Sequence, residues 1–213
     1  RIGLKVGDEL VVRAYSVVSS PFDETLEFFS IVVPEGKFTS NLQHLKVGDE
    51  LYLEKIPYGY LTLARYQLPL PQDLWLLATG TGLAPFLSML QDFETWNNYK
   101  QINLVYSVRT QAELAYVERI QEIAESFGEG HSGFKFIPII TRDPEAALHD
   151  RLPVLIANGE LEKAAAMQLN PETSHVMLCG NPDMVEDTKE ALKARGLTMN
   201  RRGEGNIAVE NYW

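Results

Sequence analysis

The sequence has little cysteine, no long apolar run and no excess of positive charge. Cys179 is the one cysteine among 213 residues, which excludes an internal disulfide and is typical of a reducing compartment. No apolar run is long enough to span a bilayer, and the first residues carry no secretory-signal pattern. With 19 Lys and Arg against 29 Asp and Glu, the net charge is −10. We therefore expect a cytoplasmic protein that binds neither membrane nor nucleic acid, with no metal site.

The composition is that of a globular protein, and the pattern of apolar residues changes once along the chain. Residues 1 to about 68 are typical of short strands separated by turns, with runs rich in Val, Leu, Phe and Tyr. After Pro69 and Pro71, apolar segments alternate with helical ones, which indicates βαβ units and a parallel sheet. We predict an antiparallel β-barrel domain over residues 1–71 and an α/β domain over residues 72–213.

The expected elements follow from these periods. In the first domain we predict strands within residues 4–18, 25–33 and 49–56, and a short helix over 40–45. In the second domain we predict strands over 74–80, 101–108, 134–142, 175–180 and 206–213. The predicted helices cover 83–96, 112–127, 152–167 and 182–196.

A glycine-rich turn, ATGTGLAP at residues 78–85, lies where a buried strand gives way to a helix. Gly80 and Gly82 allow a tight turn and the close approach of a ligand, and the free N–H groups of the helix start suit phosphate. The third glycine of the dinucleotide fingerprint is missing. On these residues alone, a plain strand-to-helix turn and a phosphate site are equal alternatives.

The end of the next strand favours one nucleotide over the other. NAD sites carry an acid about 20 residues after the turn, which bonds the ribose 2′-hydroxyl. The corresponding stretch here, VYSVRT, contains Arg109 and reaches no acid until Glu113. An arginine can pair with a 2′-phosphate, and Arg142 and Arg151 follow the third strand. Each arginine alone is more often a surface residue, but three at successive strand ends favour NADP.

Two further stretches are ambiguous when taken alone. In VVRAYSVVSSP, residues 11–21, strand alternation would place Arg13 and Tyr15 on one face. They could form an ordinary half-exposed strand, which the residues favour, or an anion grip beside a stacking platform. Cys179 ends a predicted strand, where a small buried apolar role is favoured and a functional role stays open.

Four stretches in this order, RAYS, ATGTGLAP, CGNPDM and the terminal aromatic pair, resemble the bacterial branch of the ferredoxin/flavodoxin–NADP(H) reductases. The resemblance covers essentially the whole chain. It implies an FAD enzyme that exchanges electrons between NADP(H) and ferredoxin or flavodoxin by hydride transfer to flavin N5. Two alternatives stay open: an NADH-dependent reductase that feeds an oxygenase or cytochrome, and a non-catalytic flavin-binding module.

The resemblance also implies roles for individual residues. Arg13 would hold the FAD pyrophosphate, Tyr15 would stack on the flavin ring, and Ser16 would bond near flavin N5. The catalytic set would be Ser16, Cys179, Glu210 and Tyr212. The FAD set would be Arg13, Ala14, Tyr15, Ser16, Ser30, Ile31, Val32, Lys37, Phe38, Thr39, Thr79, Tyr212 and Trp213. The NADP set would be Gly80, Thr81, Gly82, Arg109, Thr110, Arg142, Arg151 and Asp183.

Two expectations concern the rest of the molecule. Members of the family begin with further strands before the segment that residues 1–10 resemble, so we expect a barrel without its first strands, with exposed edges and an incomplete core. Ferredoxins and flavodoxins are typically acidic, so a local basic patch would dock them. The candidates are Lys189, Lys193, Arg195, Arg201 and Arg202, although such a run is usually a solvated face. Nothing demands an oligomer, and we expect a monomer.

Overall fold

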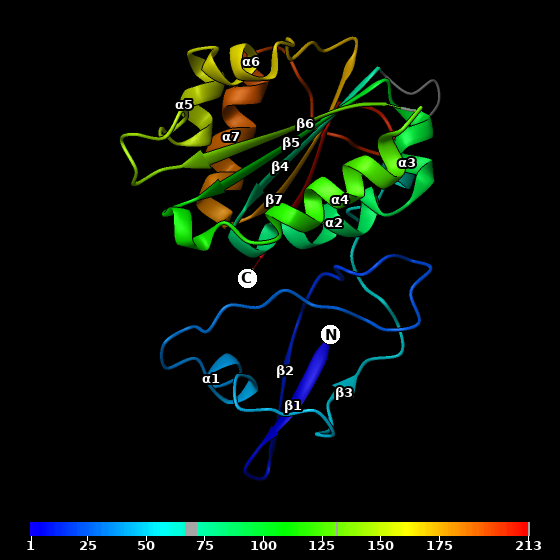
Figure 1. Cartoon of the computed structure of the whole chain (residues 1–213), viewed down its shortest axis with the longest axis vertical. Helices are drawn as coiled ribbons and strands as arrows, with labels where there is room; N and C mark the ends of the chain where they lie inside the picture. Colours follow the sequence, from blue (N-terminus) through cyan, green and yellow to red (C-terminus); the bar gives the residue numbers. More distant parts are fainter. Residues whose placement is uncertain (67–71, 131, 213) are drawn as a thin grey trace.

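The computed structural model describes residues 1–66, 72–130 and 132–212. Figure 1 shows two lobes, which we call the first lobe (residues 1–66) and the second lobe (residues 72–212, without residue 131). The predicted domain boundary at 71/72, with Pro69 and Pro71, borders on or lies outside the described residues, so it stays a prediction.

The first lobe contains a small antiparallel sheet. Strands β1 (Ile2–Val6) and β2 (Glu9–Arg13) form a hairpin, and β3 (Tyr52–Leu53) pairs with the other edge of β1. The sheet is three-stranded, in the order β2-β1-β3. Helix α1 (Thr39–Leu42) and the 3-10 turn η1 (Leu63–Arg65) complete the lobe. The antiparallel sheet is confirmed, but the described strands do not close into a barrel.

The predicted strand over 25–33 is wrong as a regular element. Only Phe28 forms a bridge, with Val17, and the flanking residues Ile31 to Val33 are exposed. A regular strand needs partners for successive N–H and C=O groups. Among the described residues, the strand pairing of this segment is limited to that bridge, with the Val18 N–H donating to the Glu27 carbonyl at 2.8 Å, although Phe28 and Phe29 pack against the cores. The segment is instead an irregular loop.

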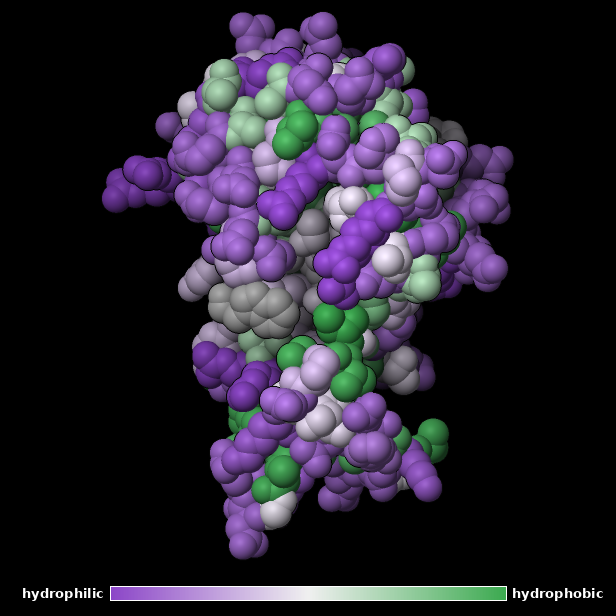
Figure 2. All heavy atoms as spheres, turned by 90° about the vertical axis from the view of Figure 1, so that its left-hand side faces the viewer, coloured by the Kyte–Doolittle hydropathy of each residue, from purple (hydrophilic) through white to green (hydrophobic). Residues whose placement is uncertain are grey.

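The core of the first lobe is small. It is built from Ile2, Leu4, Val11 and Phe38. The opposite face of the sheet leaves Leu10, Val12 and Tyr52 exposed around Gly3. Most of the exposed large apolar side chains belong to this lobe, and Figure 2 shows apolar surface on it and where the lobes meet. The expected incomplete core is therefore observed.

The second lobe is built on a parallel sheet, as predicted. Its strands are β4 (Asp73–Thr79), β5 (Gln101–Val108), β6 (Gly133–Ile140), β7 (Ser174–Gly180) and β8 (Ile207–Asn211). They pair in parallel in the order β6-β5-β4-β7-β8. The central strands β4 and β7 are almost entirely buried, which is typical of a sheet covered on both faces.

Helices cover both faces of this sheet (Figure 1). One face carries α2 (Ala84–Leu90), α3 (Phe93–Asn98) and α4 (Val117–Gly128), and the other α5 (Leu152–Ala157), α6 (Glu160–Ala165) and α7 (Pro182–Ala194). Short 3-10 turns, η2 (Gly80–Leu83) and η3 (Gln111–Glu113), precede α2 and α4. Among the described residues, the helices are all too short or too polar to span a lipid bilayer.

Two predicted helices are each split in two. The first breaks before Asp92, whose carboxylate accepts from Glu94 N at 2.9 Å and caps a new helix. The second breaks at Gly159, which has a φ of +79°, a left-handed conformation that glycine adopts without the Cβ penalty. The periodicity of apolar residues predicted which residues are helical, whereas the local capping residues determine where each helix is interrupted.

The strand order places a switch point at the centre of the sheet. From β4 the chain adds β5 and β6 on one side, and then returns to add β7 and β8 on the other. The carboxyl ends of β4 and β7, at Thr79 and Gly180, therefore lie at the switch point, which is where open α/β sheets bind ligands.

Candidate functional site

The glycines at the switch point let two strand ends pack closely. A Cβ atom on Gly82 would overlap the carbonyl oxygen of Cys179, and one on Gly180, at a φ of +137°, would overlap the Thr79 hydroxyl. Gly80 differs, because no described atom lies within 4 Å of a Cβ built there. The turn is therefore tight toward β7 and leaves open space at Gly80, which fits the close approach of a phosphate-bearing ligand.

The four predicted catalytic residues meet beside this turn. Ser16, from the first lobe, donates from Oγ to Oε1 of Glu210 at 3.2 Å. Glu210 lies on β8 directly opposite Cys179 of β7. The backbone N–H of Tyr212 donates to the carbonyl of Gly180 at 3.1 Å. Residues about 190 positions apart in the sequence thus share one site, built from both lobes.

Burial determines the protonation of this cluster. Burial raises the pKa of the Cys179 thiol to about 12. Burial, followed by the neighbouring Cys179, raises the pKa of Tyr212 well above its usual range. Both groups therefore stay neutral at physiological pH.

The Tyr212 hydroxyl is the unsatisfied group of the site. Ser16 and Cys179 lie close enough to influence its pKa, but among the described residues it makes no well-formed hydrogen bond although it is buried. A buried polar group without a partner is rare in folded proteins and indicates a place for a bound polar atom.

The predicted FAD segment presents a cation beside apolar surface. Arg13 and Ala14 are exposed at the end of β2, and the Arg13 guanidinium donates only to the carbonyl of Val12, at 2.8 Å, among the described residues. The hydroxyls of Tyr15 and Ser30 share a hydrogen bond of 2.9 Å, which joins the two predicted FAD stretches.

Two apolar side chains extend this surface. Ile31 and Val32 follow Ser30 and are about half exposed, at 49% and 50%. A guanidinium that has no acidic partner in the described part of the chain, an aromatic ring and exposed aliphatic side chains together fit a cofactor with a flat ring and a pyrophosphate.

The second predicted FAD stretch is already engaged within the lobe. Lys37 forms an ion pair with Glu9, and the Thr39 hydroxyl accepts from the N–H of Val33 at 2.9 Å. The Phe38 side chain is 2% exposed and belongs to the core. Only the Phe38 backbone is thus a candidate for contact with a ligand, whereas Lys37 would have to exchange its partner.

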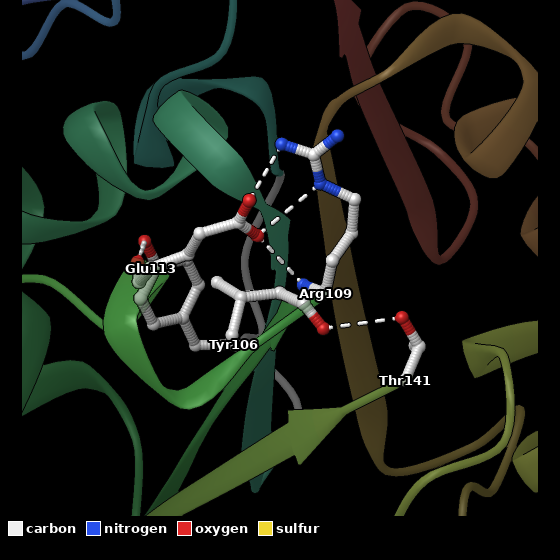
Figure 3. Close-up of polar contacts among 5 residues, drawn as sticks. Tyr106, Arg109, Glu113 and Thr141 are labelled. Atoms are coloured by element: carbon white, nitrogen blue, oxygen red, sulfur yellow. Dashed lines mark hydrogen bonds and ion pairs between the residues drawn. The ribbon is translucent and has the colours of Figure 1, made fainter. Parts of the chain in front are cut away.

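Two of the three predicted NADP arginines, Arg109 and Arg142, lie just after neighbouring strands, and Figure 3 shows Arg109 at the end of β5. Arg109 follows β5, and its carbonyl accepts from the N–H of Arg142, which lies beyond β6, at 2.8 Å. The Thr141 hydroxyl donates to the carbonyl of Val108 at 3.2 Å and joins the same two ends. Arg151 is exposed just before α5, and no hydrogen bond within the described chain links it to the other two arginines.

Glu113 is the residue of this region that sequence reasoning did not place. The 3-10 turn η3 folds back, so that the Glu113 carboxylate accepts from Arg109 N at 2.9 Å, from Nε at 3.3 Å and from NH2 at 2.5 Å. This pairing lowers the pKa of Glu113 below its usual range. The signal was the four-residue spacing of an acid from an arginine, which pairs only when the backbone turns back.

The remaining predicted residues line the same edge or fall outside the description. Thr79 accepts from the N–H of Asn181 at 3.1 Å, and the Asn181 side chain caps α7 by accepting from Asp183 N at 2.9 Å. Thr81 lies in η2, and Thr110 is exposed before η3. Trp213 lies outside the described residues. No group of three or more His, Cys, Asp or Glu in the described part of the chain could hold a metal ion.

Comparisons with known proteins agree with this geometry. A family model, the oxidoreductase NAD-binding domain, matches residues 76–190. The chain is 41% identical to a flavodoxin/ferredoxin–NADP reductase of Shigella flexneri, over 100% of this chain and 85% of that relative. It is 42% identical to a ferredoxin–NADP reductase of Pseudomonas aeruginosa, over 98% of this chain and 83% of that relative.

A solved structure shares the whole arrangement. The ferredoxin NADP+ reductase of Neisseria gonorrhoeae, with bound FAD and NADP, is 36% identical, and it superposes with a TM-score of 0.90 over 99% of this chain and 84% of that one. The resemblance inferred from the sequence is thereby confirmed. The chain belongs to the flavodoxin/ferredoxin–NADP reductase family.

Proposed function

We propose that this chain is an FAD-dependent oxidoreductase that exchanges electrons between NADP(H) and a ferredoxin or flavodoxin. The observation that carries the proposal is the cluster of Ser16, Cys179, Glu210 and Tyr212, assembled from both lobes at the switch point. A module that only bound flavin would not need this cluster beside a nucleotide turn. The names of the relatives support the same activity.

The first lobe would hold FAD. The Arg13 guanidinium would pair with the pyrophosphate, the Tyr15 ring would stack on the flavin, and Ile31 and Val32 would pack against apolar parts of the cofactor. Thr79 would contribute from the second lobe, next to the cluster. The chemistry supplied by bound FAD is acceptance of a hydride from NADPH and release of electrons one at a time.

The cluster residues would orient the reacting groups and exclude water. Ser16, fixed through Oγ by Glu210, would present its hydroxyl at the flavin edge. The Cys179 thiol and Tyr212 phenol stay protonated, so they add no charge where nicotinamide would bind. Small misplacements at such a site reduce rates strongly, which explains the backbone bond that fixes Tyr212 to Gly180.

The second lobe would hold NADP(H) along its carboxyl edge. The open space at Gly80 suits the pyrophosphate, and Arg109 and Arg142, joined through their backbones, would meet the 2′-phosphate. Arg151 would extend this clamp. The buried single cysteine supports a reducing compartment such as the cytoplasm, and we propose a monomer.

Three of the five cations in the proposed docking patch for the electron carrier form ion pairs within the second lobe. Lys189 and Lys193 pair with glutamates one turn earlier on α7. Arg195 pairs with the nearly buried Glu162 at 2.6 Å and donates to the carbonyl of Ile156, so its role is structural. The helix face is thereby largely neutralised. Arg201 and Arg202 are the better candidates because Arg202 lines a hollow of the surface.

A hollow beside these arginines supports that choice. Its lining consists of Tyr60, Ala64, Arg65, Asn200, Arg202 and Gly203. The neighbouring Gly59 approaches the Glu210 carboxylate, because a Cβ built on it would lie 3.4 Å from Oε2. The cationic hollow therefore adjoins the cluster, as an acidic electron carrier requires.

Charge reversal tests the docking surface. We expect Arg201→Glu with Arg202→Glu to slow reduction of the carrier about 10-fold or more at low salt and to leave reduction of ferricyanide unchanged. Lys163→Glu with Lys100→Glu changes the charge equally and serves as the control. A parallel fall of both rates in the arginine variant would refute the docking surface.

A visible absorption spectrum tests the function itself. We expect the purified chain, supplied with FAD and then gel-filtered, to retain a flavin band that NADPH bleaches anaerobically and NADH bleaches more slowly. The proposed function would be contradicted if the chain retained no flavin, or if neither NADPH nor NADH bleached the flavin band. Faster bleaching by NADH would favour the alternative of an NADH-dependent reductase.

A further inference from the structure

The carboxyl end of β5 offers a nucleotide both a cation and an anion. The Glu113 carboxylate contacts the backbone N–H of Arg109 and two nitrogens of its guanidinium (Figure 3). The two side chains are 62% and 35% exposed, so an arriving ligand can reach both. The inference drawn from this pair rests on the proposed function.

The two residues have opposite preferences for the two nicotinamide nucleotides. An acid at the end of this strand is the acceptor that NAD sites offer to the ribose 2′-hydroxyl, and an arginine accommodates the 2′-phosphate of NADP. The sequence places Glu113 too far along the chain for the first role. The fold of η3 brings its carboxylate back to Arg109 N, and so to the strand end.

We propose that Glu113 is a specificity-determining residue that competes with the 2′-phosphate for Arg109 and thereby narrows the preference for NADPH over NADH. The carboxylate occupies the Nε and NH2 edge of the guanidinium, which is one of the two edges that can donate two parallel hydrogen bonds to a phosphate. Phosphate binding on this edge requires an exchange of partners, and binding on the other edge shares NH2 and places like charges side by side. The lowered pKa of Glu113 keeps the carboxylate ionised at neutral pH.

A role for Glu113 in orienting Arg109 would predict the opposite change in affinity for 2′-phosphorylated nucleotides. If the carboxylate only oriented Arg109 for the phosphate, its removal would weaken binding of 2′-phosphorylated nucleotides. If it competes, its removal strengthens binding. The sign of one substitution therefore separates the two.

The experiment compares Glu113→Gln with Glu118→Gln. Both remove one negative charge, and Glu118 is exposed in the first turn of α4 and has no contact with Arg109 among the described residues. Calorimetric titration would use adenosine 2′,5′-bisphosphate, with AMP as the ligand that lacks the 2′-phosphate. We expect Glu113→Gln to lower the Kd of the bisphosphate about two- to five-fold, and to leave AMP binding unchanged.

Two further readouts complete the test. The gain should shrink between about 0.05 M and about 0.5 M salt, and the ratio of kcat/KM for NADPH over NADH should rise by the same factor as the affinity. Unchanged or weaker bisphosphate binding in Glu113→Gln, or an equal gain in Glu118→Gln, would overturn the inference. A wild-type chain that NADPH does not reduce would instead overturn the proposed function, so the two failures are distinguishable.

Discussion

At the scale of single residues, two serines of one segment reach from the first lobe to the second. Ser16 donates to the Glu210 carboxylate, and Ser20 donates to the carbonyl of Gln91, both at 3.2 Å. The bonds have equal length and cross between the same two lobes. They differ in location, because only Ser16 lies in the cluster with Cys179 and Tyr212.

This difference yields a matched pair of substitutions. We expect Ser16→Ala to lower the rate of flavin reduction by NADPH about 10- to 100-fold, because a small misplacement of reacting groups is costly. Ser20→Ala should lose a similar interlobe bond and keep the rate. Stopped-flow absorbance at saturating NADPH measures both, and equal rates for the two variants would show that Ser16 only holds the lobes together.

Residue chemistry also shows what the sequence could and could not predict. The cluster residues were predicted because four separate motifs agreed with one family, although they lie far apart in the chain. The Glu113–Arg109 pair was not predicted, because it depends on a 3-10 turn of three residues. Likewise, Arg195 looked like part of a basic patch, and only the fold reveals its partner Glu162.

At the scale of elements, strands that are buried on both faces were predicted almost to the residue. β4, β5 and β7 read as continuous apolar runs, which few other structures accommodate. The segment 25–33 has similar composition but finds only the Phe28 bridge to Val17 among the described residues. Strand formation depends on a partner, and composition does not report the partner.

The close packing of η2 on β7 gives a prediction at this scale. Gly82 has no left-handed φ, so the strain of an alanine there comes from its overlap with the Cys179 carbonyl group and the Gly180 Cα. We expect Gly82→Ala to lower the free energy of unfolding by about 1–3 kcal/mol and to weaken NADPH binding. Urea denaturation and nucleotide titration measure the two effects.

The control for this substitution is Gly7→Ala in the β1–β2 turn. Gly7 has a φ of +62° with no atom within 4 Å of an added Cβ, so alanine there adds backbone strain of about 1 kcal/mol without a clash. It should leave nucleotide binding unchanged. Normal NADPH binding by Gly82→Ala would mean that the turn tolerates a shift of β7.

At the scale of the whole molecule, a buried aromatic cluster joins Tyr66 of the first lobe to the second lobe. The Tyr66 ring stacks on His175 with centroids 3.5 Å apart, and its hydroxyl donates to the carbonyls of Val176 and Asn206 at 3.0 and 3.1 Å. On the other side, the Tyr99 hydroxyl and His175 Nδ1 share a hydrogen bond of 2.9 Å. The last described residue of the first lobe is thus fixed to the amino end of β7.

Burial lowers the pKa of His175 to about 4, from the usual 6.5. The facing titratable groups, Tyr66 and Tyr99, have pKa values raised by burial, so they stay neutral in acid and cannot compensate a histidine cation. Below the usual histidine pKa, the unfolded chain therefore binds a proton that the folded chain does not accept until about pH 4. Stability must fall as the pH drops through this window.

The expected loss from this one group is about 1 kcal/mol between about pH 7 and about pH 5.5. His175→Gln removes the titration and keeps a side chain that can bond to Tyr99, so its free energy of unfolding should fall less over the same interval, whatever its absolute stability. Urea denaturation of the wild-type chain and of His175→Gln at several pH values measures how the free energy of unfolding of each depends on pH. The contributions of the carboxylates are common to both proteins and cancel in the difference. Identical slopes would show that His175 is protonated in the folded chain, and that the aromatic cluster opens to admit the charge.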